Sequence, residues 1–137
     1  MKQLFFFLIL FSAISAHSDE LLIHTKNQTL FYQTDIAKTK ESQEKGLMFL
    51  KEIPENYGMT FLFNKPKIIH MWMKNTFIPL DMLFFDENNK IIHIHKNAEP
   101  FSKEIISSIA PAVGVVEISG GNADNQNIQI GDTITIK

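Results

Sequence analysis

Residues 71–86 read Met-Trp-Met-Lys-Asn-Thr-Phe-Ile-Pro-Leu-Asp-Met-Leu-Phe-Phe-Asp, two apolar runs separated by the polar step 74–76. The second run, 78–85, has the length and composition of a buried β-strand. Asp81 is the only charged residue within it. A carboxylate among apolar side chains costs free energy unless it is paired or hydrogen-bonded. Asp81 is therefore predicted to be either a structural anchor or part of a functional site.

Short apolar segments separated by turn-forming residues continue on both sides of this stretch, a spacing typical of an all-β domain. Residues 40–48 are predicted to form a short helix that stops at Gly46, and 102–110 either a second short helix or an irregular loop. We predict a mainly β, single-domain fold, a β-sandwich or a barrel-like sheet, with one or two short helices. The expected strands are 21–24, 29–33, 59–64, 68–73, 78–85, 91–95, 113–118 and 133–136.

The amino-terminal end has the pattern of a secretory signal peptide: Lys2, an apolar run over 4–11 and small residues up to Ala16. We therefore expect 1–16 to be removed, leaving 17–137 as one exported domain, periplasmic or secreted, without a stable membrane anchor. The chain has no cysteine, which excludes thiol catalysis and thiolate metal sites. Its net charge is −2 and all of its basic residues are lysine. Nucleic acid is therefore not an expected partner.

Several motifs resemble the domain of unknown function 192 family over nearly all of the expected domain. The longest is Trp72-Met-Lys-Asn-Thr76 followed by Ile78-Pro-Leu-Asp-Met82. Leu50 and Met71 differ from the family's usual arginine and aromatic residues. The resemblance implies a small, mostly β, often exported domain without an assigned activity. The other matching positions are Gly46-Leu47-Met48, Gly58-Met59, Phe61, Phe63, Ala98, Pro100, Pro111, Val116-Glu117, Gly121 and Gly131-Asp132.

A hairpin of 70–75 with 80–85 would place Lys74 opposite Asp81, as an opposite-charge cross-strand pair. Asn75 and Thr76 could add hydrogen bonds to the carboxylate, and Trp72 could stack on an apolar ligand. We favour a structural role for the Lys74–Asp81 pair. For function, we predict a non-enzymatic module that binds an unknown small molecule or protein at these five residues, without a cofactor or a bound metal.

Two other functions compete with this prediction. Asp81 could act as a general acid or base beside Lys74. Alternatively, the methionines and His70 could bind Cu(I), since thioether and imidazole groups suit that ion. Side chains alternate along a strand, so His70 and Met71 would point to opposite faces. Methionines also fill cores and pack against aromatic rings. We therefore favour core packing over copper.

His93 and His95 would share one face of a strand, and Glu99 follows them. This spacing partly matches the metal motif of cupin barrels, but the later histidine and the flanking glycines of that motif are missing. We favour a solvent-exposed strand face over a metal site for these residues.

Overall fold

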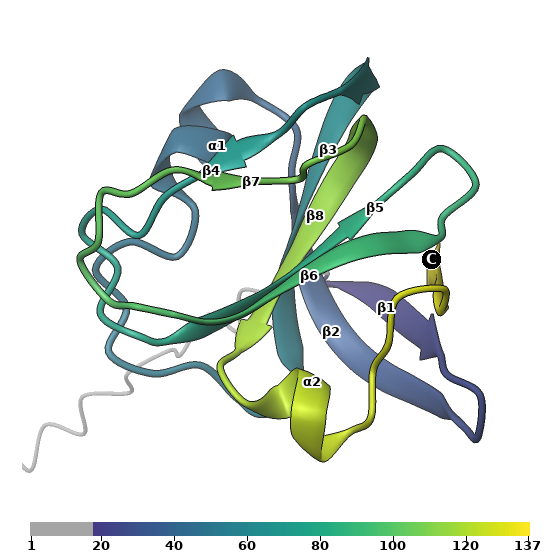
Figure 1. The fold of residues 1–137 in the computed structure, drawn as a ribbon. Coiled ribbons are helices and arrows are strands. Elements are labelled where there is room, and N and C mark those ends of the chain that lie inside the picture. The colour runs from purple at the N-terminus through teal and green to yellow at the C-terminus, as the bar shows by residue number, and fades with distance from the viewer. Residues whose placement is uncertain (1–17) are drawn as a thin grey trace, which may run out of the picture.

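A computed structural model describes residues 18–137 (Figure 1). The predicted signal peptide, 1–16, lies outside the described residues. Within 18–137 no helix is long and apolar enough to cross a membrane.

The described residues form nine strands and two short helices. Helix α1 follows β2, and α2 follows β8. The strands are β1 (Asp19–His24), β2 (Thr29–Ala37), β3 (Tyr57–Lys67), β4 (His70–Met71), β5 (Leu80–Phe85), β6 (Ile91–Ala98), β7 (Ile106–Ser107), β8 (Ala112–Ser119) and β9 (Thr133–Ile136), and the helices are α1 (Lys40–Lys45) and α2 (Asn122–Asn125).

Seven of these strands form one strongly curled sheet in the order β6-β5-β8-β3-β2-β1-β9 (Figure 1). Neighbouring strands run antiparallel except β2 and β3. The curl brings the two edges together, and a bridge between Lys90 and Thr133 joins them at one end. Strands β4 and β7 form a separate small sheet. The mainly β prediction is confirmed, in the barrel-like form.

The curled sheet packs on both of its faces. One core cluster fills the inside of the curl and includes Leu83, Val116 and the α2 residue Ala123. The second lies on the outer face of β3, β5 and β8, where the segment after α1 and the small sheet cover it. Because β5 lies between the two clusters, all of its side chains are buried. Alternate β5 residues therefore face different sides of the sheet.

Helix α1 begins at a hydrogen-bonded cap and ends at the predicted glycine. Thr39 caps it through a reciprocal pair of hydrogen bonds with Ser42. Gly46 ends it with a positive φ of 47°, which a residue with a Cβ adopts only under strain. The helix ends at Lys45, directly before the predicted stop at Gly46.

The predicted hairpin between 70–75 and 80–85 is wrong. Strand β4 contains only two residues and pairs with β7, whereas β5 pairs with β6 and β8. The chain turns after Trp72, where Asn75 has a positive φ of 52°. The predicted strand 68–73 is therefore much shorter than expected. Residues 102–110, predicted to be a short helix or an irregular loop, contain the two-residue strand β7.

Candidate ligand-binding site

A pocket of about 240 Å³ opens between α1 and the outer face of the sheet. Its walls come from α1, from the small-sheet strand β4 and the residue after it, and from strands β3 and β8. The turn after β4 contributes Thr76. The residues that line the pocket are Lys40, Gln43, Glu44, Lys45, Gly46, Leu47, Met48, Phe61, Phe63, His70, Met71, Trp72, Thr76 and Glu117.

Trp72 stands at the wall of this pocket with 42% of its surface exposed. Its indole also lines an adjoining hollow, together with Lys74 and Asn75. The Lys74 Nζ atom lies 5.1 Å from the centroid of the indole ring. On the β3 wall, Lys67 Nζ lies 4.3 Å from the centroid of the Phe63 ring. Both aromatic rings thus carry a lysine ammonium group against one face, a favourable cation–π arrangement.

Thr76 is 5% exposed and its position is set by the turn after β4. Its hydroxyl donates to the Lys74 carbonyl at 3.1 Å. Its own N–H donates to the Met73 carbonyl, and its carbonyl accepts from Phe101 N–H. Because these bonds hold the turn, Thr76 presents a fixed polar surface to the pocket.

Glu117 lines the same pocket and is 4% exposed. In the sheet it lies between Met59 of β3 and Met82 of β5, so its strand neighbours are both apolar. Burial raises the pKa of the Glu117 carboxyl from 4.5 to about 8. Within 18–137 every side-chain nitrogen or oxygen atom that is fully shielded from solvent has a hydrogen-bond partner. The Glu117 carboxyl has no partner among these residues, so its oxygens are not fully shielded, and the pocket is where they are exposed.

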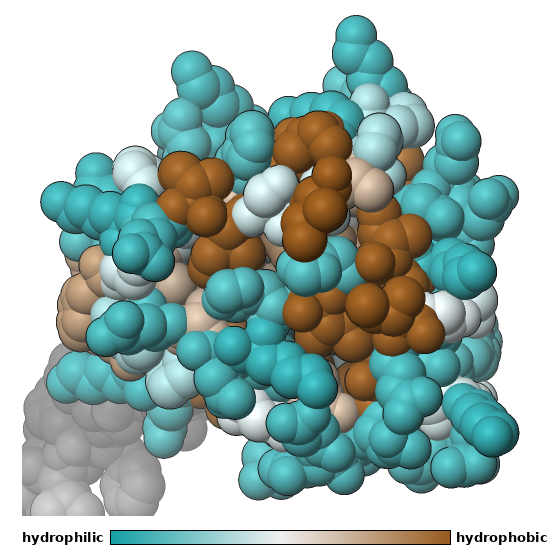
Figure 2. Space-filling model, in the orientation of Figure 1, coloured by the Kyte–Doolittle hydropathy of each residue, from teal (hydrophilic) through white to brown (hydrophobic). Residues whose placement is uncertain are grey.

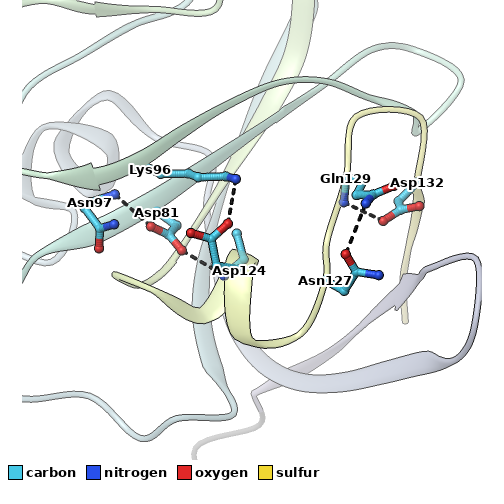
Figure 3. Close-up of polar contacts among 8 residues, drawn as sticks. Asp81, Lys96, Asn97, Asp124, Asn127, Gln129 and Asp132 are labelled. Atoms are coloured by element: carbon cyan, nitrogen blue, oxygen red, sulfur yellow. Dashed lines mark hydrogen bonds and ion pairs between the residues drawn. The ribbon is translucent and has the colours of Figure 1, made fainter.

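Asp81 is fully buried, but on the other side of the sheet from this pocket. Its Oδ1 accepts a hydrogen bond from Asn97 N–H, and its Oδ2 accepts one from Ala123 N–H, both at 2.8 Å (Figure 3). Asn97 lies in an irregularity of β6, where the register shifts opposite Asp81. Asp81 thus satisfies two backbone donors that the β ladder and the short helix α2 leave free. These two hydrogen bonds connect β6 and α2 to β5.

The predicted pairing of Asp81 with Lys74 is therefore wrong. The ion pairs among the described residues are Lys40–Glu44 and Lys96–Asp124. Strand alternation explains the error, because Asp81 shares a face with the residues that pack inside the curl. The pocket and its adjoining hollow bring together the four other predicted residues, Trp72, Lys74, Asn75 and Thr76.

Comparison with known families identifies the chain. A family model described as DUF192, "Uncharacterized ACR", matches residues 22–136. The chain belongs to the DUF192 family. This confirms the resemblance drawn from the Trp72–Thr76 motif and its neighbours.

Two solved structures have the same fold as this DUF192 domain. One, from Sinorhizobium meliloti 1021, carries the name "putative transcription regulator"; it is 32% identical over 87% of this chain and 93% of its own, with a TM-score of 0.85. The other is a protein of unknown function from Novosphingobium aromaticivorans DSM 12444, 33% identical over 85% of this chain and 83% of its own, with a TM-score of 0.83. No curated protein shows significant similarity to the chain.

The methionines of this DUF192 domain lie mainly in its core. Met73 and Met82 are fully buried in the outer-face cluster, and Met59 and Met71 pack against it. His70 is exposed on β4. Met48 and Met71 also line the pocket together with His70, so core packing accounts for Met59, Met73 and Met82 but not for every methionine.

The two histidines of β6 pack against the outer face instead of standing free in solvent. The His93 ring stacks on Phe84 at a centroid distance of 5.8 Å, and both His93 and His95 are partly buried. Burial, with a smaller contribution from His95, lowers the His93 pKa. Within 18–137 no group of three or more His, Cys, Asp or Glu side chains is arranged to hold a metal ion.

Glu117 is the pocket residue that the sequence analysis did not select. It is the only charged residue within the apolar run 112–118, as Asp81 is within 78–85. The same reasoning applied to both runs would have singled out Glu117 as a candidate.

Proposed function

We propose that this DUF192 protein is a non-enzymatic binding module that holds a small, partly apolar molecule in the pocket beside Trp72. The observation that carries the proposal is the buried Glu117 carboxyl, which faces the pocket and has no hydrogen-bond partner within 18–137. A pocket with apolar walls and a few convergent polar groups is the usual form of a small-molecule site. Trp72 supplies an aromatic wall, and Thr76 and Glu117 supply polar groups that can orient the ligand.

The proposal retains four residues of the predicted site and replaces the fifth. Lys74 and Asn75 line the adjoining hollow together with Trp72 and would contact a ligand that extends beyond the pocket. Glu117 takes the place of Asp81, whose two oxygens already bind backbone donors. We also propose that the module acts outside the cytoplasm, since 1–16 have the pattern of a signal peptide.

The test is native mass spectrometry of the protein purified from its own compartment. We expect a copurified small molecule and an amino terminus near His17. The variant Trp72→Leu should lose the ligand, because it removes the indole wall. Phe31→Leu is the matched control: Phe31 is an exposed aromatic residue that does not line this pocket. A bare mass for the wild type, or equal retention by Trp72→Leu, would contradict the proposal.

A second candidate function is acid–base catalysis in the same pocket, with Glu117 in place of Asp81. It is favoured by the pKa of about 8, which suits proton transfer near neutral pH. The copurified molecule decides between the two functions. Under catalysis, wild type should convert it to a product of altered mass or structure, and Glu117→Gln should leave it unchanged. If it is recovered unchanged from both proteins, binding alone is supported.

A further inference from the structure

The charge around the pocket differs between its mouth and its base. Lys40 and Lys45 line the wall on α1. Lys67 and Lys74 hold their ammonium groups against the rings of Phe63 and Trp72. Of these lysines, Lys40, Lys45 and Lys74 line the pocket or its adjoining hollow, and they outnumber the acidic residues of the same rim, Glu41 and Glu44.

The rim lysines are available to a ligand. Of these lysines and acids, only Lys40 and Glu44 form an ion pair, at 4.0 Å, and both of these side chains are largely exposed. Exposed pairs of this kind are weak, so Lys40 can leave Glu44 for a ligand, and the three lysines exceed the two acids of the rim by one positive charge. The mouth of the pocket therefore attracts anions and disfavours the entry of cations.

The base of the pocket offers a hydrogen-bond donor. Burial raises the Glu117 pKa to about 8, so most of the carboxyl is protonated near pH 7. A protonated carboxyl donates one O–H. Within 18–137 this donor has no protein acceptor, and desolvation is the sole cause of its pKa shift. An acceptor brought by a ligand would satisfy it.

We propose that the pocket binds a small carboxylic acid with an apolar body, whose carboxylate accepts a hydrogen bond from Glu117 beneath the lysine rim. The apolar body packs against Trp72 and Phe63. The inference rests on the proposed function and names the ligand class for that site. An ammonium ligand of the same shape should bind more weakly. It would have to pass the lysines, and it would meet a carboxyl that is mostly uncharged near pH 7.

The same geometry makes binding depend on pH. When Glu117 ionises it loses its donor, and two carboxylates then face each other in a desolvated site. Strand β5 presents only apolar side chains on this face, such as Met82. On β3, burial and then the Asp35 hydrogen bond raise the pKa of Tyr57, which keeps its phenol protonated over this range. The other titratable groups that line the pocket itself are Lys40, Glu44, Lys45 and His70, and Glu41 and Lys74 line the adjoining hollow.

The test uses three probes of one shape and different charge: phenylacetate, phenylacetamide and phenethylammonium. Binding is followed by isothermal titration calorimetry and by the fluorescence of Trp72, the only tryptophan. At about pH 6.5 we expect phenylacetate to bind most tightly and phenethylammonium most weakly. At about pH 9.5 the affinity for phenylacetate should fall roughly 30-fold, if only the protonated carboxyl binds it.

Three variants test whether Glu117 causes the pH dependence of phenylacetate binding. Glu117→Gln keeps an N–H donor and cannot ionise, so it should bind phenylacetate equally at both pH values. His70→Gln and the exposed-site control Glu104→Gln should keep the wild-type fall in affinity. Circular dichroism at both pH values confirms that each protein is folded before binding is measured.

The outcomes separate the ligand class from the proposed function. Tightest binding of phenethylammonium, or an unchanged fall in affinity for Glu117→Gln, overturns the carboxylic acid assignment while the pocket remains a binding site. Absence of binding by all three probes also overturns that assignment. The copurified mass in the wild type then decides independently whether the proposed binding function survives.

Discussion

Replacing Glu117 by Gln should change how the stability of this protein depends on pH. The two side chains have nearly the same shape, but only the carboxyl can ionise. In the folded protein burial raises its pKa from 4.5 to about 8. Between these values the native state keeps the Glu117 proton while the unfolded chain releases it. The free energy of unfolding of the wild type should therefore fall as pH rises through this range, and level off above it.

The size of this change in the free energy of unfolding follows from the shift in the Glu117 pKa. Each pKa unit corresponds to about 1.4 kcal/mol, so this carboxyl accounts for at most about 5 kcal/mol between pH 5 and pH 9. Near pH 5 the folded states of both proteins hold an uncharged group, and their stabilities should be similar. Above pH 8 the wild type carries a buried charge without a partner. Glu117→Gln should then be the more stable protein by several kcal/mol.

The assay is urea unfolding followed by circular dichroism at about pH 5, 7 and 9. Glu104→Gln, at an exposed position, is the control for removing an acidic residue without removing a buried one. Its unfolding free energy should follow that of the wild type at every pH. If the difference between wild type and Glu117→Gln changes by less than about 1 kcal/mol across the range, Glu117 is not a desolvated carboxyl, and the pocket has no buried acid at its base.

Three further changes test the structural part of the description. Asp81→Asn should lower the free energy of unfolding by about 2–4 kcal/mol in urea titrations, because an amide cannot accept from both backbone N–H groups; a loss below about 0.5 kcal/mol would contradict the anchoring role. Gly114→Ala should fail to fold or lose about 3 kcal/mol or more, since an added Cβ would lie 2.6 Å from the Phe61 carbonyl oxygen; a soluble variant with the wild-type melting temperature would refute this. Lys96→Met removes an exposed ion pair with Asp124 and should leave the thermal midpoint unchanged in a calorimetric scan; a clear drop would mean that this pair stabilises the fold.

Local patterns in the sequence predicted the features that depend on local structure. The alternation at 59–63 corresponds to β3, and Gly46 does end α1. The Trp72–Thr76 motif identified the family and pointed to the pocket wall. Each of these features depends on residues close together in the chain. Strand periodicity, helix caps and motif spacing are all of this kind.

The neighbours of Asp81 could not be predicted in this way, because they depend on strand pairing over long distances. The prediction assumed that consecutive apolar runs form a hairpin. In the fold, β5 lies against β8, where Asp81 is paired with Ile118. Its hydrogen-bond donors come from Asn97 and Ala123, both well beyond any local turn. A single sequence carries no direct signal for such pairings.

Asp81 and Glu117 show how one sequence pattern can lead to two different roles. Each is a lone acid in an apolar run, and they lie one residue out of register on the neighbouring strands β5 and β8. That offset places their side chains on opposite faces of the sheet. On the inner face, backbone donors from β6 and α2 satisfy Asp81. On the outer face, α1 and β4 leave a pocket over Glu117 instead of a donor. The Asp81 carboxylate, whose oxygens accept hydrogen bonds, stabilises the fold. The Glu117 carboxyl, which faces a pocket, is available to bind a ligand.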